Sequence, residues 1–188
     1  MHGEAPIGGL EARVCPVDRP AVVAPAGIAV FFQLDPMNEA RGRFALSCDV
    51  ASQQPERIHA YLTRSYWAEG ISLELVKRCL EGSLCFGVFC DGLQIGFARV
   101  VTDRASFAYL CDVYVLEEFR GQGVATWMME AVISHPELQN LRRFSLATRD
   151  AHGFYERFGF AAPARPRSLM EILRPGLYLQ NLPADQIR

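Results

Sequence analysis

The sequence of 188 residues lacks an excess of charge of either sign. Its 19 lysine and arginine residues are balanced by 21 aspartate and glutamate residues, which leaves a formal net charge of −2 at pH 7. It also lacks the runs of lysine and arginine that bind nucleic-acid phosphates. We therefore expect no nucleic-acid partner, and a small molecule or a peptide as the substrate.

The patterns of a metal site are missing as well. The six cysteines do not stand in the short pairs that zinc sites use, and the four histidines are scattered along the chain. Most of the cysteines fall in predicted strands and helices, where buried, reduced thiols are the simplest interpretation. The sequence predicts no metal site.

The sequence also lacks a long uninterrupted apolar run. The apolar stretch at residues 21–32 is broken by Pro25 and Gly27, and no basic segment precedes it. It is shorter than the roughly 18 to 20 apolar residues that a membrane-spanning helix needs. We expect no membrane segment and no signal peptide, and hence a cytoplasmic protein.

Half of the residues are hydrophobic, which suits one domain with a well-buried core. Residues 1–42 hold five of the 11 prolines without any sustained periodicity, so we expect a poorly structured leader there. The domain is expected to span residues 43–174, and a tail to span residues 175–188. Because Met37 stands just before the first regular segment, we hypothesise that the native chain begins at this residue. The intact mass of the protein from its native host tests this.

The spacing of apolar residues predicts the order of strands and helices. We expect strands at 44–50, 84–90, 93–101, 107–115, 143–148 and within 168–173, and helices at 55–70, 73–81, 125–133 and 151–158. Asp91-Gly92 is a strong hairpin signal between two of these strands. The order βααβββαβαβ predicts an α/β (α+β) fold with a mixed, mostly antiparallel central sheet flanked by helices.

A glycine-bearing turn, Arg120-Gly-Gln-Gly-Val-Ala125, joins the strand that ends at Val115 to a long apolar helix. Free backbone N–H groups at the start of a helix attract anions. Gly121 and Gly123 lack a Cβ atom, so phosphate groups can approach the backbone closely. The turn therefore predicts a pyrophosphate site; the alternative is a plain connection in which Arg120 is solvated.

A second motif, Phe154-Tyr-Glu-Arg-Phe-Gly-Phe160, follows the next strand. Together with the glycine turn and the element order, it resembles the GCN5-related N-acetyltransferase (GNAT) superfamily over residues 43–174. The resemblance implies acetyl-CoA as co-substrate, with its pantetheine arm between the strand ending at Val115 and the strand 144–148. The implied cofactor contacts are Val113, Val115, Arg120, Gly121, Gln122, Gly123, Val124 and Ala125. Thr148 replaces an asparagine common in the family, and its hydroxyl can still bond to a pantetheine amide.

The resemblance also implies catalytic roles. Tyr155 matches the general acid that protonates the departing CoA thiolate, since a phenol with a pKa near 10 carries its proton at neutral pH; the alternative is a core aromatic. Where the polyamine branch of the family has Leu-Glu-Asp, this chain has Leu110-Cys111-Asp112. Asp112 remains as a carboxylate that can orient an ammonium group or accept its proton through water; the alternative is a strand-edge aspartate bonded to a backbone amide or to a nearby arginine. Acetylation of Cys111 is disfavoured because no activating group can be placed beside it.

The acceptor pocket is expected at Tyr66 and Trp67, in the turn between the first two helices, together with Arg99 and Asp112. Alternatively, the two aromatic residues merely cover the core. The resemblance thus implies an N-acetyltransferase that transfers the acetyl group of acetyl-CoA to a primary amine of a small molecule or peptide by direct attack in a ternary complex. The alternatives are a non-catalytic acyl-CoA-binding or sensory module and a transferase that uses a longer acyl-CoA. The sequence leaves the acceptor amine open and is compatible with a homodimer.

Overall fold

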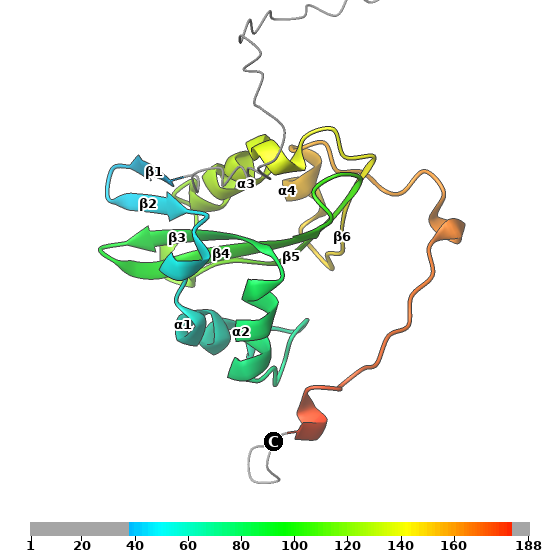
Figure 1. Cartoon of the computed structure of the whole chain (residues 1–188), viewed down its shortest axis with the longest axis horizontal. Helices are drawn as coiled ribbons and strands as arrows, with labels where there is room; N and C mark the ends of the chain where they lie inside the picture. The colour runs from blue at the N-terminus through cyan, green and yellow to red at the C-terminus, as the bar shows by residue number, and fades with distance from the viewer. Residues whose placement is uncertain (1–37, 182–188) are drawn as a thin grey trace, which may run out of the picture. The chain divides into compact units, whose positions relative to one another are not determined.

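The computed structural model describes residues 38–181, which form a six-stranded sheet in chain order (Figure 1). The strands are β1 (Asn38–Arg41), β2 (Phe44–Ser47), β3 (Leu84–Cys90), β4 (Leu93–Thr102), β5 (Phe107–Val115) and β6 (Arg143–Leu146). All neighbouring strands are antiparallel except β5 and β6, which are parallel. The mixed, mostly antiparallel sheet that the sequence predicts is thus confirmed.

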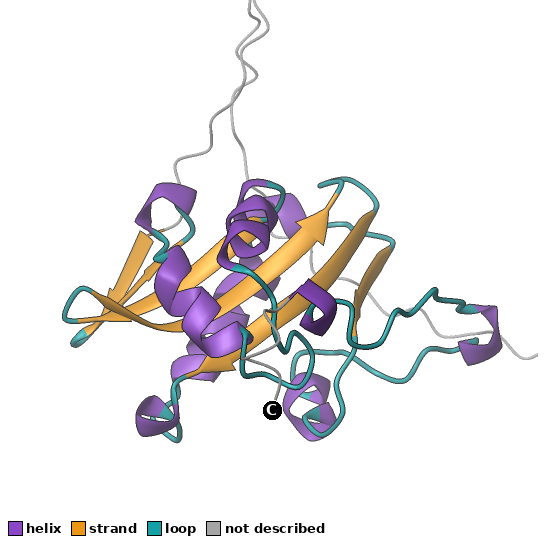
Figure 2. Ribbon diagram, turned by 90° about the horizontal axis from the view of Figure 1, so that it is seen from below, coloured by secondary structure: helices purple, strands orange, loops and turns teal. Residues whose placement is uncertain are grey.

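Helices cover both faces of the sheet. They are α1 (Pro55–Leu62), α2 (Leu73–Glu81), α3 (Val124–Ser134) and α4 (His152–Glu156), with short 3-10 turns η1 (Val50–Ser52), η2 (Glu117–Phe119), η3 (Pro136–Leu138), η4 (Pro166–Ser168) and η5 (Leu179–Asn181). Figure 1 shows α1 and α2 on one face and α3 and α4 on the other, and Figure 2 shows the helices against the twisted sheet from below. Within residues 38–181, no helix has the length and apolar character needed to cross a bilayer, and no side chains form a metal-binding cluster.

Local signals fix the ends of several elements. Pro55 is the first residue of α1, and Ser72 caps α2 by accepting a hydrogen bond from the Leu75 N–H at 3.3 Å. Asp91 and Gly92 both have positive φ, +50° and +78°, as the tight turn of a hairpin requires. These predicted boundaries are confirmed.

The apolar side chains form one cluster on each face of the sheet. On the α3 side, Phe86 and Val88 of β3 pack with Met128 and Met129 of α3, and all four are fully buried. On the α1 and α2 side, the cluster contains Ile58, Leu62, Val76, Leu80, Phe97 and Tyr114. The central strands lie between these two clusters. Close packing on both faces therefore restricts movement of the end of β5 and of the helix that follows it.

The ends of the fold differ from expectation. The sheet begins at Asn38, before the expected domain start at residue 43, because β1 pairs with β2 through a turn at Gly42. The strand expected within 168–173 does not form: η4 ends at Ser168, and the next residues have no regular structure and pair with no described strand. The Met37 hypothesis, the apolar stretch at 21–32 and most of the expected leader lie outside the described residues.

Candidate functional site

The glycine turn lies where β5 passes into α3. Gly121 and Gly123 have φ of +73° and +79°, a backbone conformation that residues with a Cβ atom rarely adopt. A Cβ atom added at either position would meet no other atom within 4 Å. Gly123 is the N-cap of α3 and has no side chain with which to cap the helix, so the first N–H groups of α3 have no partner within it. The turn therefore presents backbone donors to open space.

A groove of about 320 Å³ opens at this turn, and we call it the α3 groove. It is lined by Val115, Phe119, Arg120, Gly121, Gly123, Val124, Ala125, Thr126, Phe154 and Arg157. Most residues that the sequence placed at the cofactor line it. Three do not: the side-chain amide of Gln122 donates to the Glu118 carbonyl at 3.1 Å, Val113 lies further back on β5, and Thr148 does not line the groove. The groove thus unites the glycine turn with the helix that carries Tyr155.

Arg120 is held in place by the protein. Its Nε donates to the Val115 carbonyl at 3.0 Å, and its Nη2 donates to the Tyr61 hydroxyl at 3.0 Å and to a Glu117 carboxylate oxygen at 2.8 Å. These bonds join the end of β5 to α1 and to the start of the turn. Arg120 therefore bonds to the turn and to α1 although its side chain is 53% exposed to solvent.

Arg157 is a groove residue that the sequence analysis missed. It follows α4 directly, and its guanidinium lies 5.0 Å from the centre of the Phe154 ring. The pair stands three residues apart, which places both side chains on one face of a helix. This spacing within the Phe154–Phe160 motif could have drawn attention to Arg157 as a cation facing the glycine turn.

The two parallel strands separate beside the groove. β5 and β6 pair from Phe107 with Arg143 to Leu110 with Leu146, and the later residues of β5 have no partner on β6. The backbone groups of residues 111–115 that point toward β6 are therefore not used in that ladder. These backbone groups are available to bond the amide groups of an extended chain that reaches β5 from the groove.

Tyr155 is half-buried between the rings of Phe154 and Phe160, with ring centres 5.2 and 6.1 Å away. Burial raises its pKa to about 12, and nearby Tyr66 and Asp150 contribute to the rise. The phenol therefore keeps its proton at neutral pH. Thr148, expected at the pantetheine amide, uses its hydroxyl to accept a hydrogen bond from the Ala151 N–H at 3.1 Å, which supports the start of α4.

Asp112 is paired with an arginine. Its carboxylate accepts a hydrogen bond from Arg99 Nε at 2.7 Å, and the side chains are only 11% and 15% exposed. Arg99 also donates to the Ser83 hydroxyl at 3.1 Å. Asp112 has φ of +57° and lies at a register shift between β4 and β5, so a bulge points its side chain at Arg99. The arrangement is the arginine-paired alternative that the sequence left open.

Little space remains beside this pair. The cavity next to Arg99 and Asp112 has a volume of about 10 Å³, enough for about one water molecule. Cys111 donates its thiol hydrogen to the Arg99 carbonyl at 3.5 Å, and burial raises the pKa of this thiol to about 12. The thiol is therefore protonated at neutral pH, which agrees with the expectation that Cys111 is not a nucleophile.

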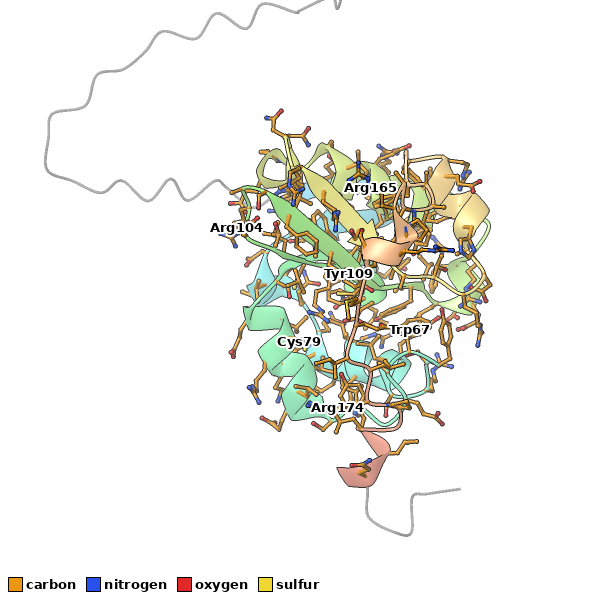
Figure 3. The ribbon with its side chains drawn as sticks, turned by 90° about the vertical axis from the view of Figure 1, so that its right-hand side faces the viewer. Trp67, Cys79, Arg104, Tyr109, Arg165 and Arg174 are labelled. Carbon is orange, nitrogen blue, oxygen red and sulfur yellow. The ribbon has the colours of Figure 1, made fainter. Side chains whose placement is uncertain are left out.

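Tyr66 and Trp67 lie elsewhere, at the surface. They are 50% and 40% exposed, and their rings meet edge to face at 4.9 Å. The Arg149 guanidinium lies 3.8 Å from the centre of the Tyr66 ring, and the Arg149 N–H donates to the Tyr66 hydroxyl at 3.3 Å. Trp67 is well separated from Cys79, which lines the small cavity beside Arg99 (Figure 3). The residues expected to bind the acceptor therefore lie in two separate places. Arg99 and Asp112 lie at the small cavity, and Tyr66 lies near Tyr155.

Known proteins resemble this chain in sequence and in fold. The model of the acetyltransferase (GNAT) family matches residues 50–160. A candidate acetyltransferase of Gibberella zeae is 33% identical over 138 residues, which cover 61% of this chain and 77% of that protein. A crystal structure of a candidate GNAT acetyltransferase from Xanthomonas campestris pv. campestris is 51% identical, with a TM-score of 0.72, over 74% of this chain and 99% of that one.

A more distant structure shares the fold alone. It is a candidate acetyltransferase of Clostridium acetobutylicum solved with acetyl-CoA, and it is 15% identical, with a TM-score of 0.52. The match covers 69% of this chain and 94% of that one.

Proposed function

Because the chain belongs to the acetyltransferase (GNAT) family, we propose that it transfers the acetyl group of acetyl-CoA to a primary amine of a small molecule or a peptide. The observation that carries this proposal is the α3 groove, in which two open glycine positions, the start of an 11-residue helix and Arg157 face one space. The described cysteines are all free thiols, which supports a cytoplasmic location.

The pyrophosphate of CoA would bind at the start of α3. The N–H groups of the first helical turn supply donors, and the helix dipole adds partial positive charge. Arg157 supplies a full charge from the opposite wall of the groove. The pantetheine arm would then extend along β5, where the backbone of Val113 and Val115 can bond to its amides.

The transfer itself would proceed by direct attack. The neutral amine nitrogen attacks the thioester carbonyl, the new C–N bond forms as the C–S bond breaks, and the thiolate takes a proton from Tyr155. The phenol is suited to this role because burial keeps it protonated at neutral pH. The amine loses its own proton to water, and water returns a proton to the Tyr155 phenolate. Transfer of a proton from the amine to Asp112 would have to pass through water. Arg99 and the small cavity leave no room for the amine to contact the carboxylate directly.

The acceptor would bind beside Tyr66 and Trp67. Both rings are exposed next to the side of the site that carries Tyr155, and an aromatic surface of this kind suits an ammonium-bearing molecule or a peptide end. Arg99 and Asp112 are satisfied by each other, so we assign them to shaping β5 rather than to binding the acceptor directly.

Release of free thiol from acetyl-CoA tests the proposal. The protein is incubated with acetyl-CoA alone and with a panel of amino acids, polyamines, amino sugars and peptides. We expect at least one amine to raise thiol release far above the rate without acceptor. If acetyl-CoA binds but no amine in the panel raises the rate, the chain is a non-catalytic CoA-binding module.

A binding comparison addresses the length of the acyl chain. Titrations with acetyl-CoA, succinyl-CoA and longer thioesters are compared in the same buffer. We expect acetyl-CoA to bind at least as tightly as the others. If a longer thioester binds clearly more tightly than acetyl-CoA, then the longer acyl-CoA is the donor and this part of the proposal is wrong.

A further inference from the structure

A tyrosine of α1, Tyr61, reaches the glycine turn from the other face of the sheet. Figure 1 shows α1 and α3 on opposite faces, and Arg120 lies in the connection between β5 and α3. The Arg120 Nη2 donates a hydrogen bond to the Tyr61 hydroxyl at 3.0 Å, although the two residues are 59 positions apart in the sequence. This bond therefore connects the helix on one face with the turn that begins the helix on the other.

The Tyr61 ring is held by its neighbours. It stacks on the Tyr114 ring, with ring centres 3.8 Å apart and ring planes at 9°. Tyr114 is only 4% exposed and belongs to the apolar cluster under α1 and α2. The Arg64 guanidinium lies 5.0 Å from the centre of the Tyr61 ring, and the centre of the Trp67 ring lies 6.4 Å away. Packing of these rings therefore sets the position of the Tyr61 hydroxyl.

Tyr61, Arg120 and β5 form a closed loop of contacts. The Tyr61 ring lies on Tyr114, and the Tyr61 hydroxyl accepts the hydrogen bond from Arg120. The Arg120 Nε then donates to the carbonyl of Val115, the residue after Tyr114. Because the loop begins and ends on consecutive residues of one strand, Arg120 is tied to the end of β5 both directly and through Tyr61.

The glycine turn itself has few other side-chain restraints. Gly121 and Gly123 have no side chains, and a Cβ atom at either would meet nothing within 4 Å. The side-chain bond of Gln122 to a backbone carbonyl is exposed. Glu117 also pairs with Arg120, but both side chains are more than half exposed, and pairs of this kind contribute little. Glycines allow many backbone conformations, so the turn needs a restraint from outside to stay in one of them.

We propose that Tyr61 is a positioning residue for acetyl-CoA binding. Its hydroxyl holds Arg120, and Arg120 holds the glycine turn in the conformation in which its N–H groups face the α3 groove. This inference rests on the proposed function, which places the pyrophosphate at that turn. Tyr61 does not line the groove, so it acts through Arg120 rather than by contact with the ligand. A turn that is already ordered loses less conformational entropy when the ligand binds, and this raises the affinity.

Tyr61→Phe tests the proposal, because it keeps the ring and its stack on Tyr114 and removes only the hydroxyl. We expect the dissociation constant of acetyl-CoA, measured by calorimetric titration, to rise about fivefold through loss of a hydrogen bond to a charged group. The matched control is Tyr178→Phe, at another partly buried tyrosine that packs against the cluster of α1 and α2, and it should leave the affinity unchanged. Equal losses in the two variants, or no loss in Tyr61→Phe, overturn the proposal.

A double-mutant cycle separates positioning through Arg120 from a general effect on the fold. In a chain with Arg120→Ala, the Tyr61 hydroxyl has already lost its partner, so adding Tyr61→Phe should weaken acetyl-CoA binding no further. Urea denaturation checks that all the variants remain folded. A further fivefold loss in the Arg120→Ala chain would show that Tyr61 acts independently of Arg120, and it would contradict the proposal.

NMR spectra without any ligand test the positioning separately from acetyl-CoA binding. We expect Tyr61→Phe to shift the Arg120 Nε–H signal and the backbone amide signals of Gly121 and Gly123, and Tyr178→Phe to leave them in place. If the wild-type chain binds acetyl-CoA but these signals do not respond to Tyr61→Phe, the positioning role is wrong and the proposed function stands. If the wild-type chain binds no acetyl-CoA, the proposed function fails, and a role for Tyr61 in acetyl-CoA binding fails with it even where the signals respond.

Discussion

The α3 groove and the Arg99–Asp112 pair both depend on β5, but they are built in opposite ways. The groove is lined at its turn by Gly121 and Gly123, and it is open there because these residues carry no side chain that would occupy it. The pair consists of two side chains that satisfy each other at 2.7 Å and leave a cavity of only about 10 Å³. The contrast teaches that the groove we propose for acetyl-CoA is open already, whereas Arg99 and Asp112, which were expected to bind the acceptor, bond to each other and hold β5.

Loss of the ion pair is the largest effect that we expect. Asp112→Asn leaves the Arg99 charge mostly buried without its partner, which should lower the free energy of unfolding by about 3 kcal/mol. The matched control is Glu130→Gln, which breaks the exposed Arg41–Glu130 pair and should cost less than about 1 kcal/mol. Urea denaturation measures both. Equal, small losses would mean that the Arg99–Asp112 pair does not hold β5.

The glycine turn gives the next largest effect. Gly123→Val fills the open space at the start of α3 and should weaken acetyl-CoA binding about a hundredfold, since one side chain blocks several backbone donors. Gly92→Val is the control, because Gly92 has almost the same φ, +78° against +79°, and similar open space, but lies on a distant hairpin. Calorimetric titration measures both affinities. A similar loss in the two variants would trace the effect to strain rather than to the groove.

Tyr155 should affect turnover rather than binding. Tyr155→Phe removes the acid, and we expect kcat to fall about tenfold, less than for many general acids because a thiolate is a good leaving group. Tyr109→Phe, at another partly buried tyrosine, serves as the control. Because burial raises the pKa of Tyr155 to about 12, wild-type thiol release should show no loss from ionisation of this phenol until the pH rises toward that value. Identical kcat values for the Tyr155→Phe variant and the wild type would remove Tyr155 from the mechanism.

Arg157 should give the smallest effect. Arg157→Ala removes one partly solvated cation from the wall of the groove, so we expect the dissociation constant of acetyl-CoA to rise about fivefold, and less at high salt. Arg78→Ala, at an exposed position on α2, is the control. The titrations are repeated at two salt concentrations. An effect that is unchanged by salt would indicate loss of packing on Phe154 rather than loss of charge.

The sequence predicted the features that depend on local chemistry. Pro55, Ser72 and Asp91-Gly92 set element ends through their own backbone preferences, and the structure follows them. The glycine turn belongs to the same class, because positive φ at Gly121 and Gly123 is a property of those residues. Such features can be recognised without knowing what lies across the sheet.

The features that depend on distant partners could not be decided from the sequence. The pairing of Asp112 with Arg99 requires the register of β4 against β5 and the bulge between them, which no single segment specifies. The segment Leu169–Leu173 has the composition of a strand, but a strand needs an edge to pair with, and its linker carries it away from β6. Long-range geometry therefore determines the pairing of Asp112 and the conformation of residues 169–173.

The most direct test of the central claim is to follow the backbone amides while CoA is added. In the nitrogen–proton NMR spectrum of the full chain, we expect the largest shifts at Gly121, Gly123 and Ala125, with smaller shifts along residues 111–115. The amide of Gly92 should not move. If the largest shifts fall outside the glycine turn, for example around Arg99 and Asp112, then the α3 groove is not the site of the CoA pyrophosphate.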